Sequence, residues 1–359
     1  MKLPTLALGE LIASVPIIQG GMGVGVSRSG LASAVANEGG IGIISGAQIG
    51  FTESDFETNS MEANIRALRK EIRKARELSP KGILGVNLMV AMNHYKELAM
   101  TAVEEKINLI ISGAGLPKDL PSIVKGTKTK IAPIVSSGKA AQLITKLWDR
   151  KYNQIPDMVV VEGPKAGGHL GFTLNELQQN PIPDLGRIVQ EVKESLQSFQ
   201  SKYGKMIPVI AAGGIFDGND IAKYLKLGAS GVQMGTRFVA TDECDADIRF
   251  KEAYINSKEE DIQYVKSPVG MPGRAIYNEF TKRLDDVGRI PVKKCYDCLL
   301  PCNPKSTPYC ISKALIEAVK GNLEEGLIFS GANAHKIKEI VSVKKLIQQL
   351  IAETEVALA

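Results

Sequence analysis

A short apolar run followed by a glycine-rich turn leads to one of the three histidines in the chain. The run at residues 159–161 ends at the carboxylate of Glu162, and residues 163–168 then lead to His169. An imidazole ring placed after a buried strand can accept or donate a proton near neutral pH. A ring that only hydrogen-bonds its own loop is the structural alternative. We predict that His169 is a catalytic residue.

Four glycine-rich loops follow predicted strands and together indicate a flat cofactor that carries a phosphate group. They contain residues 20–23, residues 163–168, Gly213 with Gly214, and Gly235 with Thr236. Glycine allows the backbone to approach a ligand closely. The last two loops can direct their backbone N–H groups at one dianion, and Thr236 adds a hydroxyl donor. Tight turns without a ligand are the alternative explanation.

Four of the five cysteines lie close together near the C-terminus. Cys295, Cys298, Cys302 and Cys310 have the spacing C-x2-C-x3-C-x7-C. Thiolates this close in sequence can bind zinc or an iron–sulfur cluster. The spacing matches no standard zinc pattern, so a group of reduced thiols is the alternative. Cys244 is distant from the other four in the sequence, and we predict that it is an ordinary thiol in the core or at the surface.

Short apolar segments that alternate with helical patterns predict the scaffold for these loops. The predicted strands are residues 15–19, 41–45, 83–89, 108–112, 131–136, 158–162, 208–212 and 231–235. The predicted helices between them are residues 29–37, 61–78, 95–106, 120–125, 138–150, 185–201 and 217–227. Eight such units favour a closed (β/α)8 TIM barrel in the α/β class over an open sheet. The loops after the strands would then share one face, where barrel enzymes have their active sites.

The βα repeat ends near residue 243, which predicts a barrel at residues 1–243 and a C-terminal cap at residues 244–359. Helices are expected at residues 250–256, 311–320 and 335–349, and a loop at residues 267–274 is able to lie over the barrel mouth. The apolar content of this C-terminal extension is too low to predict a separate core.

The composition narrows the function classes. The net charge of +5 is spread over interleaved acidic and basic residues, which argues against nucleic acid as a partner. No apolar run approaches the roughly 20 residues of a membrane span. The N-terminus has no secretory leader pattern, so a cytoplasmic location is expected.

The glycine loops and the histidine loop resemble the nitronate monooxygenase family, formerly called 2-nitropropane dioxygenases. The motifs are IQGGMG at residues 18–23, EGPKAGGH at 162–169, PVIAAGGI at 208–215 and QMGTRF at 233–238. Most of them are also similar to the related flavin-dependent enoyl-acyl-carrier-protein reductase of type II. The resemblance covers residues 10–245 and implies an FMN-binding barrel.

The resemblance also implies roles for individual residues. It places the FMN phosphate on Gly213, Gly214, Gly235 and Thr236, the isoalloxazine ring against Gly21 and Met22, and polar flavin contacts at Asn87 and Glu162. Gly167 and Gly168 leave backbone room beside the flavin, and His169 corresponds to the family's catalytic residue.

The implied activity is oxidation of alkyl nitronates, and of nitroalkanes if His169 abstracts the proton α to the nitro group, with dioxygen as co-substrate. His169 could instead hydrogen-bond the oxygens of a preformed nitronate. The alternative enoyl reductase would use NAD(P)H and an acyl carrier protein, for which Arg274, Lys282 and Arg283 are the candidate basic contacts.

Other functions compete less well. A purine-nucleotide dehydrogenase barrel needs a nucleophilic cysteine after the sixth strand, and none occurs between Val161 and Pro208. A non-catalytic flavin-binding protein is the last alternative. A metal cluster in the extension would suggest an electron relay to the flavin. A homodimer is compatible with the sequence.

Overall fold

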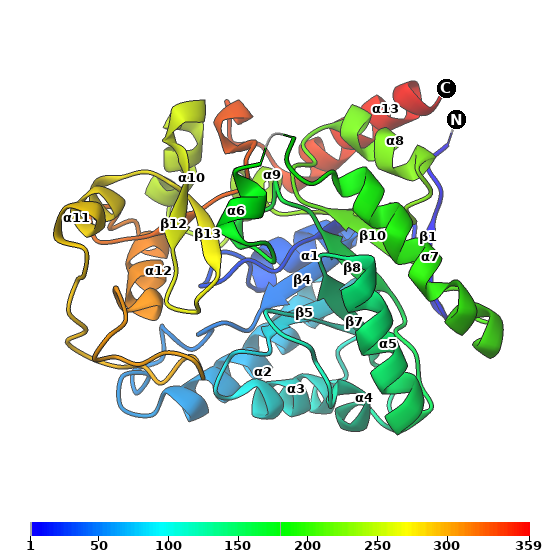
Figure 1. Ribbon diagram of the computed structural model, residues 1–359, viewed down its shortest axis with the longest axis horizontal. Helices are drawn as coiled ribbons and strands as arrows, with labels where there is room; N and C mark the ends of the chain where they lie inside the picture. The colour runs from blue at the N-terminus through cyan, green and yellow to red at the C-terminus, as the bar shows by residue number, and fades with distance from the viewer. Residues whose placement is uncertain (1, 180) are drawn as a thin grey trace.

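Eight parallel strands form a closed barrel within residues 2–179 and 181–359, which the computed structural model describes (Figure 1). The barrel strands are β3 (Ile17–Gln19), β4 (Ile41–Ser45), β5 (Ile83–Met89), β6 (Leu109–Gly113), β7 (Lys130–Val135), β8 (Val159–Glu162), β10 (Val209–Ala212) and β11 (Gly231–Met234). Strand β11 pairs with β3 and closes the circle. The predicted (β/α)8 fold is confirmed, and each barrel strand falls at a predicted segment.

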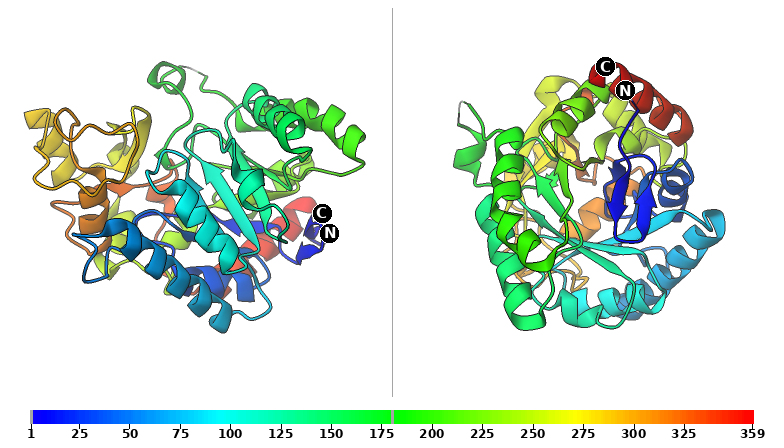
Figure 2. Two further views of the ribbon diagram at one scale, coloured as in Figure 1. Left: turned by 90° about the horizontal axis from the view of Figure 1, so that it is seen from below. Right: turned by 90° about the vertical axis from the view of Figure 1, so that its right-hand side faces the viewer.

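The barrel interior is filled by side chains that point inward from alternate positions of these β-branched strands. Ile18, Ile43, Val160 and Ile210 form this inner cluster and are fully buried. A short antiparallel hairpin of β1 (Leu6–Leu8) and β2 (Leu11–Ala13), absent from the predicted elements, contributes Leu6, Leu8 and Ala13 to the same cluster. The hairpin lies at one end of the barrel (Figure 2), and its buried side chains pack on the inner cluster.

Helices surround the barrel and cover its outer face. The seven predicted barrel helices are present as α1 (Ser29–Asn37), α2 (Ser60–Leu78), α3 (Tyr95–Glu104), α4 (Leu120–Ile123), α5 (Gly138–Tyr152), α7 (Leu185–Tyr203) and α8 (Gly218–Lys226). The last helix of the chain, α13 (Val343–Leu358), packs against α8 and α1 and completes the ring. The amphipathic α13 therefore belongs spatially to the barrel wall, although it follows the extension in the sequence.

The helix predicted at residues 335–349 has the wrong bounds. Residues 334–336 form only a short 3-10 turn, η2 (Ala334–Lys336), and the α-helix begins at Val343. The reason is local: the Ser342 side chain accepts a hydrogen bond from the backbone N–H of Lys345 and caps the helix there. Before this cap, Val341 forms a bridge with Thr241 that holds the chain extended.

The C-terminal extension forms a small sheet and helices at the barrel mouth. Its elements are α10 (Ile248–Asn256), η1 (Glu259–Asp261), β12 (Ile262–Lys266), β13 (Pro272–Ile276), α11 (Glu279–Val287), α12 (Ile311–Val319) and β14 (Ile328–Phe329). The loop predicted at residues 267–274 is wrong in part, because β13 begins at Pro272 and pairs with β12. Strand β13 also pairs with β9 (Gly168–His169), which lies in the loop after β8. The short helices α6 (Leu174–Leu177) and α9 (Thr236–Val239) complete the fold.

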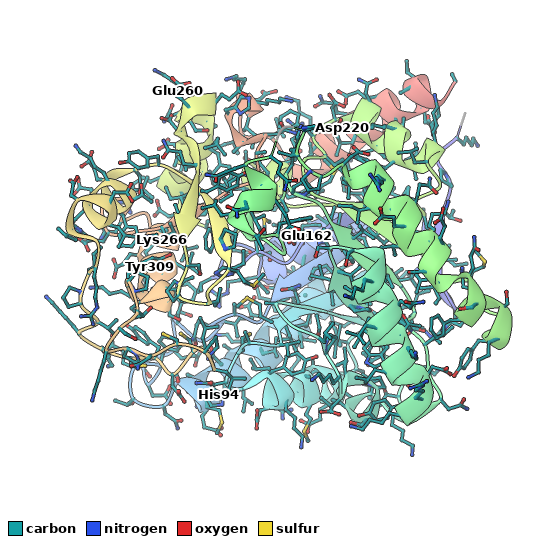
Figure 3. The ribbon with its side chains drawn as sticks, viewed as in Figure 1. His94, Glu162, Asp220, Glu260, Lys266 and Tyr309 are labelled. Atoms are coloured by element: carbon teal, nitrogen blue, oxygen red, sulfur yellow. The ribbon has the colours of Figure 1, made fainter. Side chains whose placement is uncertain are left out.

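The extension contains a small apolar cluster, and Met89 and Ala91 of the barrel also pack against it. Phe280, Leu284, Tyr309 and Leu327 are buried in this cluster. Tyr309 donates a hydrogen bond to the carbonyl oxygen of Lys266 at 2.9 Å and so ties this cluster to β12 (Figure 3). Among the described helices, none combines the length and apolar character that a membrane crossing requires.

Candidate active site

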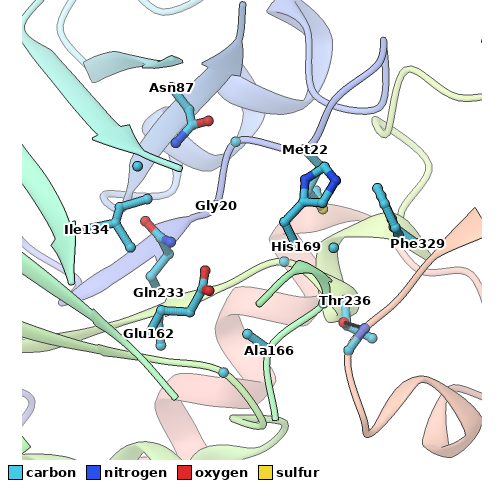
Figure 4. A pocket seen from close by; sticks show the side chains of 18 of the residues that line it. Gly20, Met22, Asn87, Ile134, Glu162, Ala166, His169, Gln233, Thr236 and Phe329 are labelled. Atoms are coloured by element: carbon cyan, nitrogen blue, oxygen red, sulfur yellow. Dashed lines mark hydrogen bonds between the residues drawn. The ribbon is translucent and has the colours of Figure 1, made fainter. Parts of the chain in front are cut away.

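The loops at the C-terminal ends of the strands enclose a cavity of about 460 Å³, within the size range of cofactor pockets (Figure 4). All of the residues predicted for catalysis and cofactor binding line it: Gly21, Met22, Asn87, Glu162, Gly167, Gly168, His169, Gly213, Gly214, Gly235 and Thr236. They come from loops far apart in the sequence and meet because parallel barrel strands end at the same face.

His169 is held in the cavity wall by the pairing of β9 with β13. In this pairing His169 lies opposite Gly273. Its Nε2 atom lies 2.6 Å from the Oγ atom of Ser267, and its ring contacts the Phe329 ring edge-on, with centroids 5.1 Å apart. Burial lowers the pKa of His169 to about 4, because the charged ring would lose its hydration. The imidazole is therefore neutral at pH 7.

Glu162 ends strand β8 with its carboxyl group directed into the cavity (Figure 4). Burial raises the pKa of Glu162 to about 7, and a hydrogen bond from the backbone of Gly171 offsets only part of this rise. Near neutral pH this carboxyl group is therefore divided between its protonated and ionised forms.

Gln233 begins the QMGTRF motif, but the resemblance gave this residue no role at the site. It lies in strand β11 and lines the same cavity wall as Glu162 and Asn87 (Figure 4). Its Oε1 atom is buried and has no hydrogen-bond partner among the described residues. Buried amide oxygens are rarely left unpaired, so this atom points to a ligand with a hydrogen-bond donor. The sequence feature that could have identified Gln233 as a site residue is its position just before the Gly235 loop.

Gly213 and Gly214 have a backbone conformation that suits glycine. Their φ angles are +98° and +80°, and a Cβ atom would lie 2.9 Å from the Ala166 backbone nitrogen in the first case and 2.7 Å from the Lys165 Cβ atom in the second. Thr236 completes this corner, and its Oγ1 atom accepts a hydrogen bond from the backbone N–H of Gly331 at 3.1 Å. This glycine corner and the unpaired Gln233 oxygen fit a flat, phosphate-bearing cofactor such as FMN.

The extension contributes several cavity residues that sequence reasoning missed. Phe329 and residues 330–333 line the cavity, and Ser267 contacts His169. Arg274, considered as a contact for a partner protein, is only 5% exposed and donates to the carbonyl oxygen of Ala166 and to the Tyr264 hydroxyl. Arg274 therefore braces the histidine loop and does not offer its charge to a partner.

The structure gives no support for the zinc or iron–sulfur site predicted at the four clustered cysteines. No group of three or more His, Cys, Asp or Glu side chains is arranged to hold a metal ion in the described part of the chain. Cys298, Cys302 and Cys310 are half-buried free thiols, and Cys295 is exposed. Burial raises the pKa of Cys298 to about 11, so its thiol stays protonated at neutral pH.

The barrel, together with a cavity at its C-terminal face that gathers a neutral histidine and a glycine corner, defines a (β/α)8-barrel enzyme. A family model described as nitronate monooxygenase matches residues 6–353. The chain belongs to this family, and the protein is an oxidoreductase.

Individual relatives agree with this assignment. A probable nitronate monooxygenase of Staphylococcus saprophyticus is 25% identical over 98% of both chains. A probable nitronate monooxygenase of Staphylococcus aureus is 29% identical over 77% of this chain and 79% of its own length. Among solved structures, FabK of Thermotoga maritima is 28% identical, with a TM-score of 0.71 over 96% of this chain and 94% of its own. Nitroalkane oxidase of Streptomyces ansochromogenes, at 20% identity, shares the fold with a TM-score of 0.72 over 96% of each chain.

Proposed function

We propose that the protein is an FMN-dependent oxidoreductase that oxidises alkyl nitronates with dioxygen. The observation that carries this proposal is the meeting, in one cavity, of a neutral His169 and the glycine corner formed by Gly213 and Gly214. A neutral imidazole suits an anionic, electron-rich substrate because it can donate a hydrogen bond or accept a proton.

Gly213, Gly214, Gly235 and Thr236 would hold the phosphate of FMN, and Asn87, Glu162 and Gln233 would hold the polar edge of its ring system. Bound FMN supplies the chemistry of accepting electrons from the nitronate carbon and delivering them to dioxygen. The apolar side chains of Met22, Ile134 and Phe329 line the same cavity, where they would exclude water and accept the alkyl group.

His169 would act on the nitro group or on the proton next to it. In one tautomer its unprotonated nitrogen accepts the α proton of a nitroalkane; in the other its N–H holds the oxygens of a preformed nitronate. The Ser267 hydroxyl can donate or accept a hydrogen bond, so it supports the ring in both tautomers. Ser267 is therefore proposed as a positioning residue.

Replacing Ser267 with alanine is expected to lower kcat on propyl nitronate by roughly 10-fold, the equivalent of one lost hydrogen bond. Water that enters beside the ring would also raise the pKa of His169 from its lowered value, so the acidic limb of the pH–kcat profile should move to higher pH. Steady-state kinetics between pH 4.5 and 8 measure both effects. Ser267→Thr keeps the hydroxyl and should restore most of the activity, whereas an unchanged profile in Ser267→Ala would exclude the positioning role.

The reaction itself is tested by mixing the FMN-loaded protein anaerobically with propyl nitronate in one cell and NADPH in another. Nitronate oxidation predicts rapid loss of the oxidised flavin absorbance with propyl nitronate and its return when dioxygen is admitted. Rapid bleaching by NADPH alone would contradict the proposal and favour an enoyl reductase.

Three basic residues were considered as contacts for the acyl carrier protein that an enoyl reductase would use. Arg274 is buried and Arg283 is paired with Glu325, so of the three only Lys282 is exposed.

A further inference from the structure

Residues 330–333, which follow strand β14 in the C-terminal extension, form part of the cavity wall. Hydrogen bonds attach this segment to the loops that would hold the FMN phosphate. The backbone N–H of Gly331 donates to Thr236 Oγ1 at 3.1 Å, and that of Ala332 donates to the Lys165 carbonyl oxygen at 3.2 Å. The Asn333 side-chain amide donates to the Gly214 carbonyl oxygen at 2.7 Å. The segment therefore joins three barrel loops at one point.

Within this segment, the Ser330 side chain has no partner. Ser330 is only 3% exposed and lines the cavity, yet its Oγ atom makes no hydrogen bond among the described residues. A buried hydroxyl without a partner is unfavourable, and such groups in native proteins usually have a ligand or an ordered water. A hydrogen bond from the Ser330 N–H to the Arg274 carbonyl oxygen at 3.1 Å fixes the backbone that carries this hydroxyl.

The surroundings of Ser330 favour an anionic ligand. The adjacent Gly331 occupies the acceptor side of the Thr236 hydroxyl, which leaves the Thr236 hydrogen free to be donated. Lys165 lines the same part of the cavity, and its Cβ atom lies next to Gly214. Two hydroxyl donors and glycine backbone in one corner are suited to the dianion of a phosphate monoester.

We propose that the Ser330 hydroxyl donates a hydrogen bond to the phosphate group of FMN, and that residues 330–333 close the phosphate site from the extension. The proposal rests on the proposed use of FMN and adds a ligand from outside the barrel repeat. It also connects cofactor binding to the structure of the extension. The segment at residues 330–333 follows directly after the sheet that holds His169, so a phosphate contact there would stabilise both.

The test compares FMN with riboflavin, which lacks the phosphate, on the apoprotein of the full chain. For Ser330→Ala, the dissociation constant of FMN, measured by quenching of flavin fluorescence, should rise about 10-fold, as expected for the loss of a hydrogen bond to a charged group. The dissociation constant of riboflavin should stay within about twofold. Ser79→Ala is the matched control, because the Ser79 hydroxyl is also buried and unpaired but lies outside the cavity lining.

The remaining outcomes separate this proposal from the proposed function. An equal loss of affinity for FMN and riboflavin would overturn the phosphate contact, as would unchanged affinity for both. A wild-type protein that binds neither flavin would overturn the proposed use of FMN. If Ser330→Ala does not fold, hydrogen exchange in the wild type decides: the amides of Gly331 and Ala332 should exchange more slowly with FMN than with riboflavin, and equal exchange would contradict the proposal.

Discussion

Replacing His169 with alanine is expected to lower kcat on nitroalkanes by roughly 10²- to 10⁴-fold, the range for loss of a general base. The physical reason is that the neutral ring would be the proton acceptor of the cavity, held by Ser267 and packed against Phe329. FMN binding should stay within about threefold, because the ring would contact substrate rather than the phosphate corner. Oxygen consumption at saturating substrate measures kcat, and flavin fluorescence measures FMN binding.

His169→Asn separates the two proposed roles of the ring. An asparagine amide keeps a hydrogen-bond donor but cannot act as a base. It should therefore retain most of the turnover of preformed propyl nitronate and lose that of 1-nitropropane. His335→Ala is the matched control, since His335 lies in η2, outside the cavity lining. Full turnover of both substrates by His169→Ala would refute a catalytic role.

The second large effect concerns the pH dependence of stability, and it comes from Glu162. Its pKa is about 7 in the folded protein and near 4.5 in the unfolded chain, because burial disfavours the ionised carboxylate. At a pH between these two pKa values, the Glu162 carboxyl group stays protonated in the folded protein and is ionised in the unfolded chain. Raising the pH therefore destabilises the fold, and the full effect, about 3 kcal/mol, is present above the folded-state pKa.

Glu162→Gln removes this ionisation and keeps a side chain of similar shape. Urea unfolding of the two apoproteins at pH 4.5, 6 and 8 should show the wild type losing about 3 kcal/mol relative to the variant over this range. The lowered pKa of His169 makes the free energy of unfolding rise with pH below the unfolded-state pKa of this residue, which is the opposite direction. Because His169 is present in both proteins, its contribution cancels in the difference between them. Glu77→Gln, at an exposed position of α2, is the control. A constant difference between wild type and Glu162→Gln would show that Glu162 ionises normally.

Much of the barrel and of the cavity could be predicted from the chain alone. Each barrel strand was visible as a short, mainly apolar run, and each predicted cavity residue lies at or just after such a run. These predictions succeed because they depend on local backbone conformation. The turn directly after β10 needs a left-handed backbone, which selects glycine at Gly213 and Gly214 independently of the rest of the chain. The end of a parallel strand also determines the face on which its loop lies.

The extension could not be predicted in the same way. Strand β14 has two residues and β9 also has two, which is too short for any periodic pattern. The completion of the helical ring by α13 depends on where the chain returns after the extension. The cysteine spacing suggested a metal, but spacing along the chain does not determine the arrangement of the side chains, and no group suited to a metal ion is found among the described residues.

By itself, therefore, the sequence determined the barrel, the face that carries the site and the residues of its loops, because periodicity and glycine-rich turns act over a few positions. Only the tertiary structure decided what surrounds His169. Ser267 lies 98 residues beyond it, and Gly331 lies 95 residues beyond Thr236. Contacts over such separations, the unpaired hydroxyl of Ser330 and the raised pKa of Glu162 all arise from packing and exclusion of water, which no local pattern encodes.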